Sequence, residues 1–157
     1  MQILFFEDDS LLAEKNRVKE IFTRVRNDGL LISNVNGVNL IHFYNTKDRT
    51  RWMNGKWDID TEYLEILRDA GFDQIVFPVE SGSKRVLKKY ATNKTNLDRM
   101  DLVLLMKEMT ELGIKAPVNM MIGFPDESEK EINKTIEFSK KLMDAGAPYV
   151  TFFIPIP

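Results

Sequence analysis

The chain has 157 residues, 43% of them hydrophobic, which is enough apolar material for one domain with a buried core. Its 22 lysines and arginines stand against 24 acidic residues, so the formal net charge of -2 favours neither a nucleic-acid-binding protein nor a membrane-surface protein. Because the chain has no cysteine and one histidine, it cannot form a disulfide, a Cys/His zinc site or a cysteine-ligated iron–sulfur cluster by itself. The sequence contains neither a membrane-spanning apolar run nor a signal peptide, and we therefore expect a cytoplasmic protein.

Short apolar runs alternate with helical patterns along the chain. Helical segments with apolar residues at helical spacing stop at Gly29, Gly71, Gly113 and Gly146. The runs between them predict strands at residues 3–6, 38–44, 74–79, 118–122 and 149–154. This alternation is typical of βα units in a mostly parallel sheet, either doubly wound or a (β/α) barrel. Five strands are fewer than a closed barrel needs, so we expect the chain to be part of a longer one, truncated at both ends.

Polar residues follow the predicted strands, where ligands bind to parallel α/β sheets. Glu7, Asp8 and Asp9 follow the first strand, and adjacent carboxylates of this kind hold a cation or accept hydrogen bonds from an ammonium group. The alternative for Asp9, or for Ser10, is that it caps the next helix.

Glu80 and Ser81 follow the third strand and offer a carboxylate beside a hydroxyl, which suits the vicinal hydroxyls of a sugar. The structural alternative is that Ser81 or Ser83 caps the next helix and Glu80 is only solvated. Several cations lie between Lys84 and Lys94; most suit a solvated helix face, but one can pair with a ligand carboxylate.

The segment from Asn119 to Pro125 joins a buried strand to a glycine and a proline. Backbone groups exposed around Ile122 and Gly123 can read the edge of an adenine, although a plain strand-to-helix turn explains the same letters. The longest irregular stretch, residues 45–60, contains two tryptophans among cations. Tryptophans that cap the end of the sheet account for this stretch, so we do not expect it to contact nucleic acid.

Taken together, these motifs resemble, in order and spacing, the radical S-adenosylmethionine (SAM) superfamily. They are most similar to its cobalamin-dependent branch, which includes the magnesium-protoporphyrin IX monomethyl ester cyclase-like proteins. The resemblance covers nearly the whole chain and implies that residues 1–157 form a partial (β/α)6 barrel, an open TIM-like horseshoe to which they contribute strands two to six. In that superfamily a C-x3-C-x2-C loop holds a [4Fe-4S] cluster, and this loop is absent from the sequence.

The resemblance also implies roles for particular residues. The acids at positions 7 to 9 would lie near the methionine ammonium of SAM, and Lys94 near its carboxylate. Glu80 and Ser81 would face the ribose, and the segment containing Asn119, Ile122 and Gly123 would face the adenine. Family members often have glycine where this chain has Pro78, which removes a backbone donor from the pairing of that strand.

The function implied is that of a radical SAM enzyme that cleaves SAM reductively to start radical chemistry on a small-molecule substrate. The [4Fe-4S] cluster, and cobalamin where it is used, would belong to the longer parent protein. Without cluster cysteines we expect this chain to be inactive alone and to bind SAM weakly.

Two alternatives come from other classes. Residues 3–9 also resemble the first strand and acidic pair of a response-regulator receiver domain, a phosphoacceptor, but the third predicted strand ends in Glu80 and Ser81 rather than in aspartate. The other alternative is a noncatalytic α/β interaction module. Whether the chain is a partial barrel or an interaction module, the open sheet edge at residues 2–6 can pair with a second copy, and we therefore expect self-association.

Overall fold

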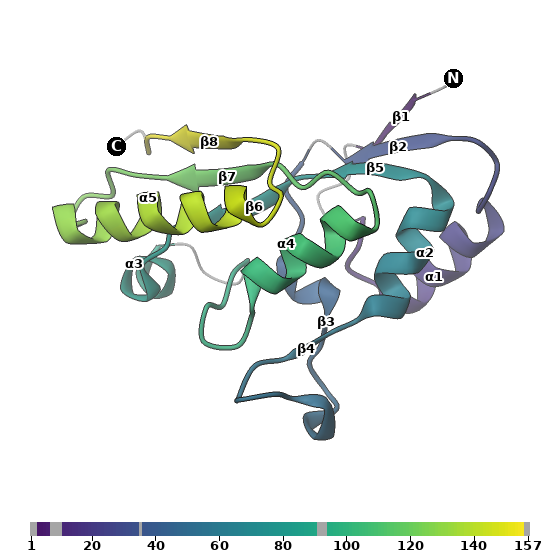
Figure 1. The fold of residues 1–157 in the computed structure, drawn as a ribbon, viewed down its shortest axis with the longest axis horizontal. Coiled ribbons are helices and arrows are strands. Elements are labelled where there is room, and N and C mark those ends of the chain that lie inside the picture. Colours follow the sequence, from purple (N-terminus) through teal and green to yellow (C-terminus); the bar gives the residue numbers. More distant parts are fainter. Residues whose placement is uncertain (1–2, 7–10, 35, 91–93, 156–157) are drawn as a thin grey trace.

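The computed structural model describes residues 3–6, 11–34, 36–90 and 94–155. Two parallel three-stranded sheets form its wall. The first contains β1 (Ile3–Phe6), β2 (Leu31–Asn34) and β5 (Phe72–Ile75), and the second contains β6 (Phe77–Glu80), β7 (Val118–Met121) and β8 (Val150–Phe153). Only Val76 separates β5 from β6, so these two follow one another as a single line of backbone shared by both sheets. The sheets therefore form one open wall that is five strands wide (Figure 1). This architecture confirms the predicted partial α/β barrel.

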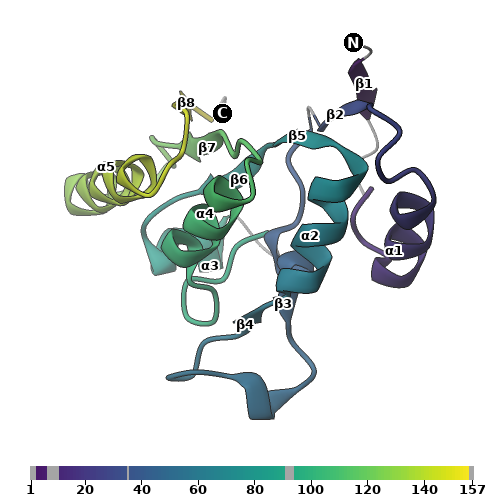
Figure 2. The ribbon, with the colours of Figure 1, turned by 45° about the vertical axis from the view of Figure 1, so that its right-hand side comes forward.

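Helices cover one face of this wall, as Figures 1 and 2 show. They are α1 (Lys15–Arg24), α2 (Thr61–Ala70), α4 (Leu102–Glu111) and α5 (Glu129–Asp144), with the short α3 (Lys84–Lys89) after β6. The core lies between wall and helices, where a set of side chains from both layers is fully buried: Leu67, Ile75, Phe77, Leu105, Val118 and Met120. Each such side chain stabilises the fold by about 1.5–3 kcal/mol through burial.

Local signals place the helix ends. The Asp60 side chain accepts a hydrogen bond from Tyr63 N–H at the start of α2, and Gly71 closes that helix with a left-handed φ of 99°. The Asp101 side chain caps α4 in the same way, so this helix begins after the turn at residues 97–99. The first helix ends at Arg24, before the predicted stop at Gly29.

The predicted strand at residues 38–44 is wrong. Leu40–Phe43 forms a 3-10 helix, η1, whose first turn is capped by the Asn39 side chain, and the true second strand is β2. The apolar residues of this run enter the core all the same, with Leu40 and Phe43 fully buried. A short apolar run satisfies a buried helical turn as well as a buried strand, so the pattern alone did not separate the two.

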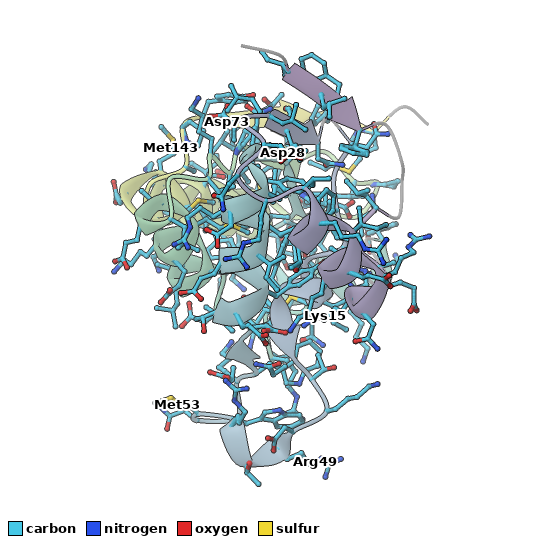
Figure 3. All side chains as sticks on the ribbon, turned by 90° about the vertical axis from the view of Figure 1, so that its right-hand side faces the viewer. Lys15, Asp28, Arg49, Met53, Asp73 and Met143 are labelled. Carbon is cyan, nitrogen blue, oxygen red and sulfur yellow. The ribbon has the colours of Figure 1, made fainter. Side chains whose placement is uncertain are left out.

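An arm between β3 (Tyr44–Asn45) and β4 (Asp58–Ile59) projects away from the wall, and it includes a second 3-10 helix, η2 (Arg49–Arg51). Arg49 and Met53 lie at its far end (Figure 3). The guanidinium groups of Arg49 and Arg99 both lie over the Trp52 ring, at 5.7 Å and 5.2 Å from its centroid. The tryptophans of this arm therefore have packing roles within the protein.

β1 is the first edge of the wall and pairs only with β2 within the described residues. Its apolar side chains are poorly covered, since Ile3 is 54% exposed and Phe5 is 61% exposed. In the part of the chain that the structure describes, no helix is long and apolar enough to cross a bilayer.

Candidate functional site

A pocket of about 520 Å³ opens on the face of the wall that carries no helices. The alternation of side chains along β7 shows on which face the pocket lies. Val118 and Met120 are fully buried on the helix side, whereas Asn119 and Met121 point the other way and line the pocket. The volume is in the range of small-molecule sites. The complete lining comes from several segments and consists of Gly37, Pro78, Glu80, Lys94, Asn119, Met121, Phe153, Ile154 and Pro155.

Glu80 reaches this pocket from a strained backbone. Its φ is 70°, which is rare for a residue other than glycine, and the N–H of Ser81 donates to the carbonyl of Val79 across it at 2.9 Å. A positive φ enclosed by a hydrogen bond from residue i+2 to residue i is the pattern of a γ-turn, a strained three-residue turn. Strain of this kind persists where surrounding contacts enforce it, and it is frequent at ligand sites.

Three polar groups meet in the pocket. Lys94 Nζ lies 3.2 Å from Glu80 Oε1, and the Glu80 side chain is only 13% exposed. The third polar group is the Asn119 amide. The side chains of Met121, Phe153 and Ile154 form an apolar side of the pocket beside these groups. A carboxylate, an ammonium, an amide and an apolar wall together suit a ligand with hydroxyls, a negative charge and a flat ring.

Ser81 does not line the pocket. Its side chain is fully buried and lies 3.1 Å from the hydroxyl of Thr135 in α5, so the structure directs it toward the helix layer. The helix after this turn is capped instead by Ser83, whose hydroxyl accepts from Val86 N–H.

Ile122 and Gly123 also lie beside the pocket lining rather than in it. Ile122 N–H donates to Phe153 O in β8 at 3.0 Å, and Gly123 N–H donates to the Glu127 carboxylate at 2.7 Å. Their N–H groups are therefore engaged within the protein. Gly123 has a φ of 92°, which explains the glycine at this turn.

The acids Glu7, Asp8 and Asp9 lie outside the described residues. Within those residues, no cluster of three acidic, histidine or cysteine side chains is arranged to hold a metal ion.

Pro78 stays paired with Asn119 of β7, and the register of the two strands shifts between Pro78 and Glu80. Phe77 N–H donates to Pro117 O at 2.8 Å, and since successive backbone groups point to opposite sides of a strand, position 78 faces away from β7. The Pro78 carbonyl accepts from the Thr95 hydroxyl at 3.3 Å. Its ring also packs against Gly37, where an added Cβ would lie 2.9 Å from it.

The sequence analysis did not identify Gly37 or Phe153 as lining residues. Gly37 precedes the wrongly predicted strand, so its place beside Pro78 had no sequence signal. Phe153 was recognisable only as part of an apolar strand, although strand alternation would have placed it on one face with Thr151.

An ion-pair cluster ties α3 to α5 behind the pocket. Arg85 forms two hydrogen bonds with the Glu131 carboxylate, at 2.6 Å and 2.8 Å, and a third with Asp126 at 2.9 Å. Arg85, followed by Ser128, lowers the pKa of Glu131, and Lys89 with Tyr90 lowers the pKa of Asp126. Both carboxylates are thus ionised at neutral pH; Glu131 holds α3 to α5, and Asp126 holds α3 to the loop before α5.

An open wall of parallel strands, with helices on one face and a small-molecule-sized pocket on the other, places the chain in the (β/α)-barrel class of folds. The family model of the radical SAM superfamily matches residues 8–139 of the chain. The chain belongs to the radical SAM superfamily.

Two curated relatives are methyltransferases by name. The chain is 29% identical over 152 residues to the uncharacterised methyltransferase PH0819 of Pyrococcus horikoshii, across 97% of this chain and 28% of the relative. It is 26% identical over 157 residues to cytidylyl-2-hydroxyethylphosphonate methyltransferase of Streptomyces wedmorensis, across 96% of this chain and 26% of the relative. The chain thus spans about a quarter of the length of these relatives.

A solved structure has the same fold. It is the radical SAM methyltransferase TsrM of Kitasatospora setae with cobalamin and a [4Fe-4S] cluster bound, and it superposes with a TM-score of 0.71 over 97% of this chain and 27% of TsrM. The sequence identity is 13%, so the similarity shows the fold alone.

The residues present do not fit both groups that this superfamily uses. The chain has no cysteine, so it offers no thiolate ligand for a [4Fe-4S] cluster. The pocket with Glu80, Lys94 and Asn119 does fit SAM, which carries ribose hydroxyls, a carboxylate and an adenine ring.

Proposed function

We propose that the chain is the SAM-binding part of the barrel of a radical SAM enzyme, and that the pocket lined by Glu80 is its nucleoside site. The observation that carries this proposal is the convergence of Glu80, Lys94 and Asn119, from three separate segments, on one pocket. SAM supplies an activated sulfonium whose carbon–sulfur bond is broken in the chemistry of this superfamily.

In this proposal the protein's residues bind and orient the ligand. The Glu80 carboxylate accepts hydrogen bonds from the ribose hydroxyls, and Lys94 pairs with the methionyl carboxylate. The apolar wall of Met121, Phe153 and Ile154 covers the adenine and excludes water from it. Asn119 supplies an amide for the remaining polar groups of the ligand.

The type of reaction is proposed from the relatives. Two curated relatives carry the name methyltransferase, and the structure of TsrM, which has a similar fold, holds bound cobalamin. Both findings support a cobalamin-dependent methyltransferase as the parent protein. The relatives reported above give no specific support to the cyclase-like branch that the sequence motifs suggested. The receiver-like alternative is not favoured, because the superfamily match covers most of the chain.

Nuclear magnetic resonance titration of the 157-residue chain with S-adenosylhomocysteine, a stable analogue, tests the nucleoside site. We expect a dissociation constant of roughly 0.1–1 mM, because the chain lacks the cluster that would anchor the amino acid end. Glu80→Gln should weaken binding about tenfold or more, since a hydrogen bond to a charged group is lost. Glu65→Gln, on the exposed side of α2, is the matched control and should bind like the wild type.

The same preparation tests the expected inactivity. After incubation with iron and sulfide under reducing conditions, the chain should show no iron–sulfur absorbance and form no 5′-deoxyadenosine from SAM, because it has no cysteine. Equal binding by Glu80→Gln and wild type would refute the nucleoside site, and deoxyadenosine formation would refute the inactivity.

A further inference from the structure

The turn that follows Glu80 is attached to α5 through one hydroxyl. Thr135 Oγ1 lies 3.1 Å from Ser81 Oγ, 3.0 Å from Gly82 N and 3.2 Å from Glu131 O. Ser81 Oγ in turn lies 3.0 Å from Ser83 N. Ser81 and Thr135 are both fully buried, so water does not replace these contacts.

Counting donors fixes the direction of each bond. A hydroxyl has one hydrogen to donate, and the Glu131 carbonyl can only accept, so Thr135 donates to that carbonyl. Thr135 Oγ1 then accepts from Gly82 N–H and from the Ser81 hydroxyl, which itself accepts from Ser83 N–H. Every hydroxyl in the chain of bonds is satisfied, and Thr135 is the residue through which the turn is connected to α5.

Two other contacts keep the turn against the helix. The backbone of Gly82 approaches α5 so closely that an added Cβ would lie 2.6 Å from Lys134 O. Ser83 Oγ donates to the Glu131 carboxylate at 3.0 Å, and Arg85 holds that carboxylate from the other side. The first turns of α5 therefore form a rigid support for residues 81–83.

This support begins one residue after the strained φ of Glu80. The γ-turn ends at Ser81, whose N–H closes it and whose side chain is bonded to Thr135. If Ser81 moved away from α5, Glu80 would be free to relax to a negative φ, and its carboxylate would leave the position beside Lys94.

We propose that Thr135 is a positioning residue: without touching the ligand, its hydroxyl holds the Ser81–Ser83 turn and so keeps Glu80 in the conformation that presents its carboxylate to the pocket. This inference rests on the proposed nucleoside site, because it assigns a purpose to the strain at Glu80. It makes α5, which contributes no residue to the pocket lining, part of the binding machinery.

The experiment compares three variants of the chain by titration with S-adenosylhomocysteine and by urea unfolding. Thr135→Val keeps the shape and removes the hydroxyl, and we expect it to weaken binding about fivefold to tenfold. Thr135→Ser restores the hydroxyl and should bind within about twofold of the wild type. Thr110→Val in α4 is the control for loss of a hydroxyl in another helix, because the exposed Thr110 hydroxyl also bonds to a carbonyl four residues earlier, at 2.8 Å.

A direct readout of the backbone accompanies the affinities. The three-bond coupling between the amide and α protons of Glu80 reports φ, and it should change in Thr135→Val and remain in Thr135→Ser and Thr110→Val. This coupling distinguishes positioning from a general loss of stability, which urea unfolding measures in each variant.

The outcomes separate this inference from the proposed function. Wild-type affinity in Thr135→Val, together with weakened binding in Glu80→Gln, would overturn the positioning role alone. Equal weakening by Thr135→Val and Thr110→Val would also overturn it. Absence of binding by the wild-type chain would overturn the nucleoside site itself, and with it the purpose assigned to Thr135.

Discussion

Gly82→Ala is the sharpest test of how the turn packs on α5. The added Cβ would lie 2.6 Å from Lys134 O and 2.9 Å from Thr135 Cα, and both atoms belong to helix backbone that cannot swing aside as a flexible side chain would. Either the turn or the helix must move, at a cost of about 1–3 kcal/mol for overpacking. Movement also lengthens the 3.0 Å bond from Gly82 N to Thr135, at about 1 kcal/mol.

Alanine also restricts the unfolded chain, which stabilises the folded state by about 0.4–1 kcal/mol and offsets part of this cost. We therefore expect Gly82→Ala to lower the free energy of unfolding by about 2–3 kcal/mol, a large share of the 5–15 kcal/mol that is typical of a folded domain. Urea unfolding followed by circular dichroism measures this change.

Gly55→Ala provides the control for backbone strain without a clash. Gly55 has a φ of 75° and nothing within 4 Å of an added Cβ, so the substitution carries only the left-handed strain, about 1 kcal/mol after the gain in the unfolded chain. If Gly82→Ala were no more destabilising than Gly55→Ala, the tight contact between the turn and α5 would be refuted.

The ion pairs between α3 and α5 should make stability depend on pH. Because Arg85 and Lys89 lower the pKa values of Glu131 and Asp126 from 4.5 and 3.8, the stability from these carboxylates is complete above those ordinary values and is lost as the pH falls through the lowered ones. Urea unfolding should therefore show a decline below about pH 4.5 that Glu131→Gln flattens, and an equal slope in both proteins would contradict this account. The exposed edge strand β1 leads us to expect self-association at high concentration, which Phe5→Lys should reduce in light scattering. A constant monomer mass over a wide concentration range would count against it.

The sequence predicted best what short-range chemistry decides. The helix stop at Gly71 and the cap at Ser83, which was predicted as an alternative to Ser81, depend on groups within a few residues, so the sequence could indicate them. The strand at 38–44 failed because burial, which the apolar run does predict, does not specify whether the backbone is extended or helical.

The candidate site was predictable where strand ends decide it. Glu80 was singled out because the ends of parallel strands meet at one edge, and Lys94 and Asn119 through the family resemblance; the structure brings all three to one pocket. Ser81 shows the limit of this rule. Its side chain direction depends on the positive φ of Glu80, which no local pattern signals, and on Thr135, 54 residues further along the chain.

The break at Val76 has a consequence for what a ligand does to the whole domain. The first sheet is paired through β5 and the second through β6, while the pocket takes Gly37 from beside the first and its other lining from the second and its neighbouring loops. A bound molecule therefore contacts both half-walls, which also share one hydrophobic core and the hydrogen bonds between residues 73–75 and Lys115. By mass action, a ligand at 100 times its dissociation constant adds about 2.7 kcal/mol to folding, and because it contacts both halves, this gain adds to the contacts that already join them.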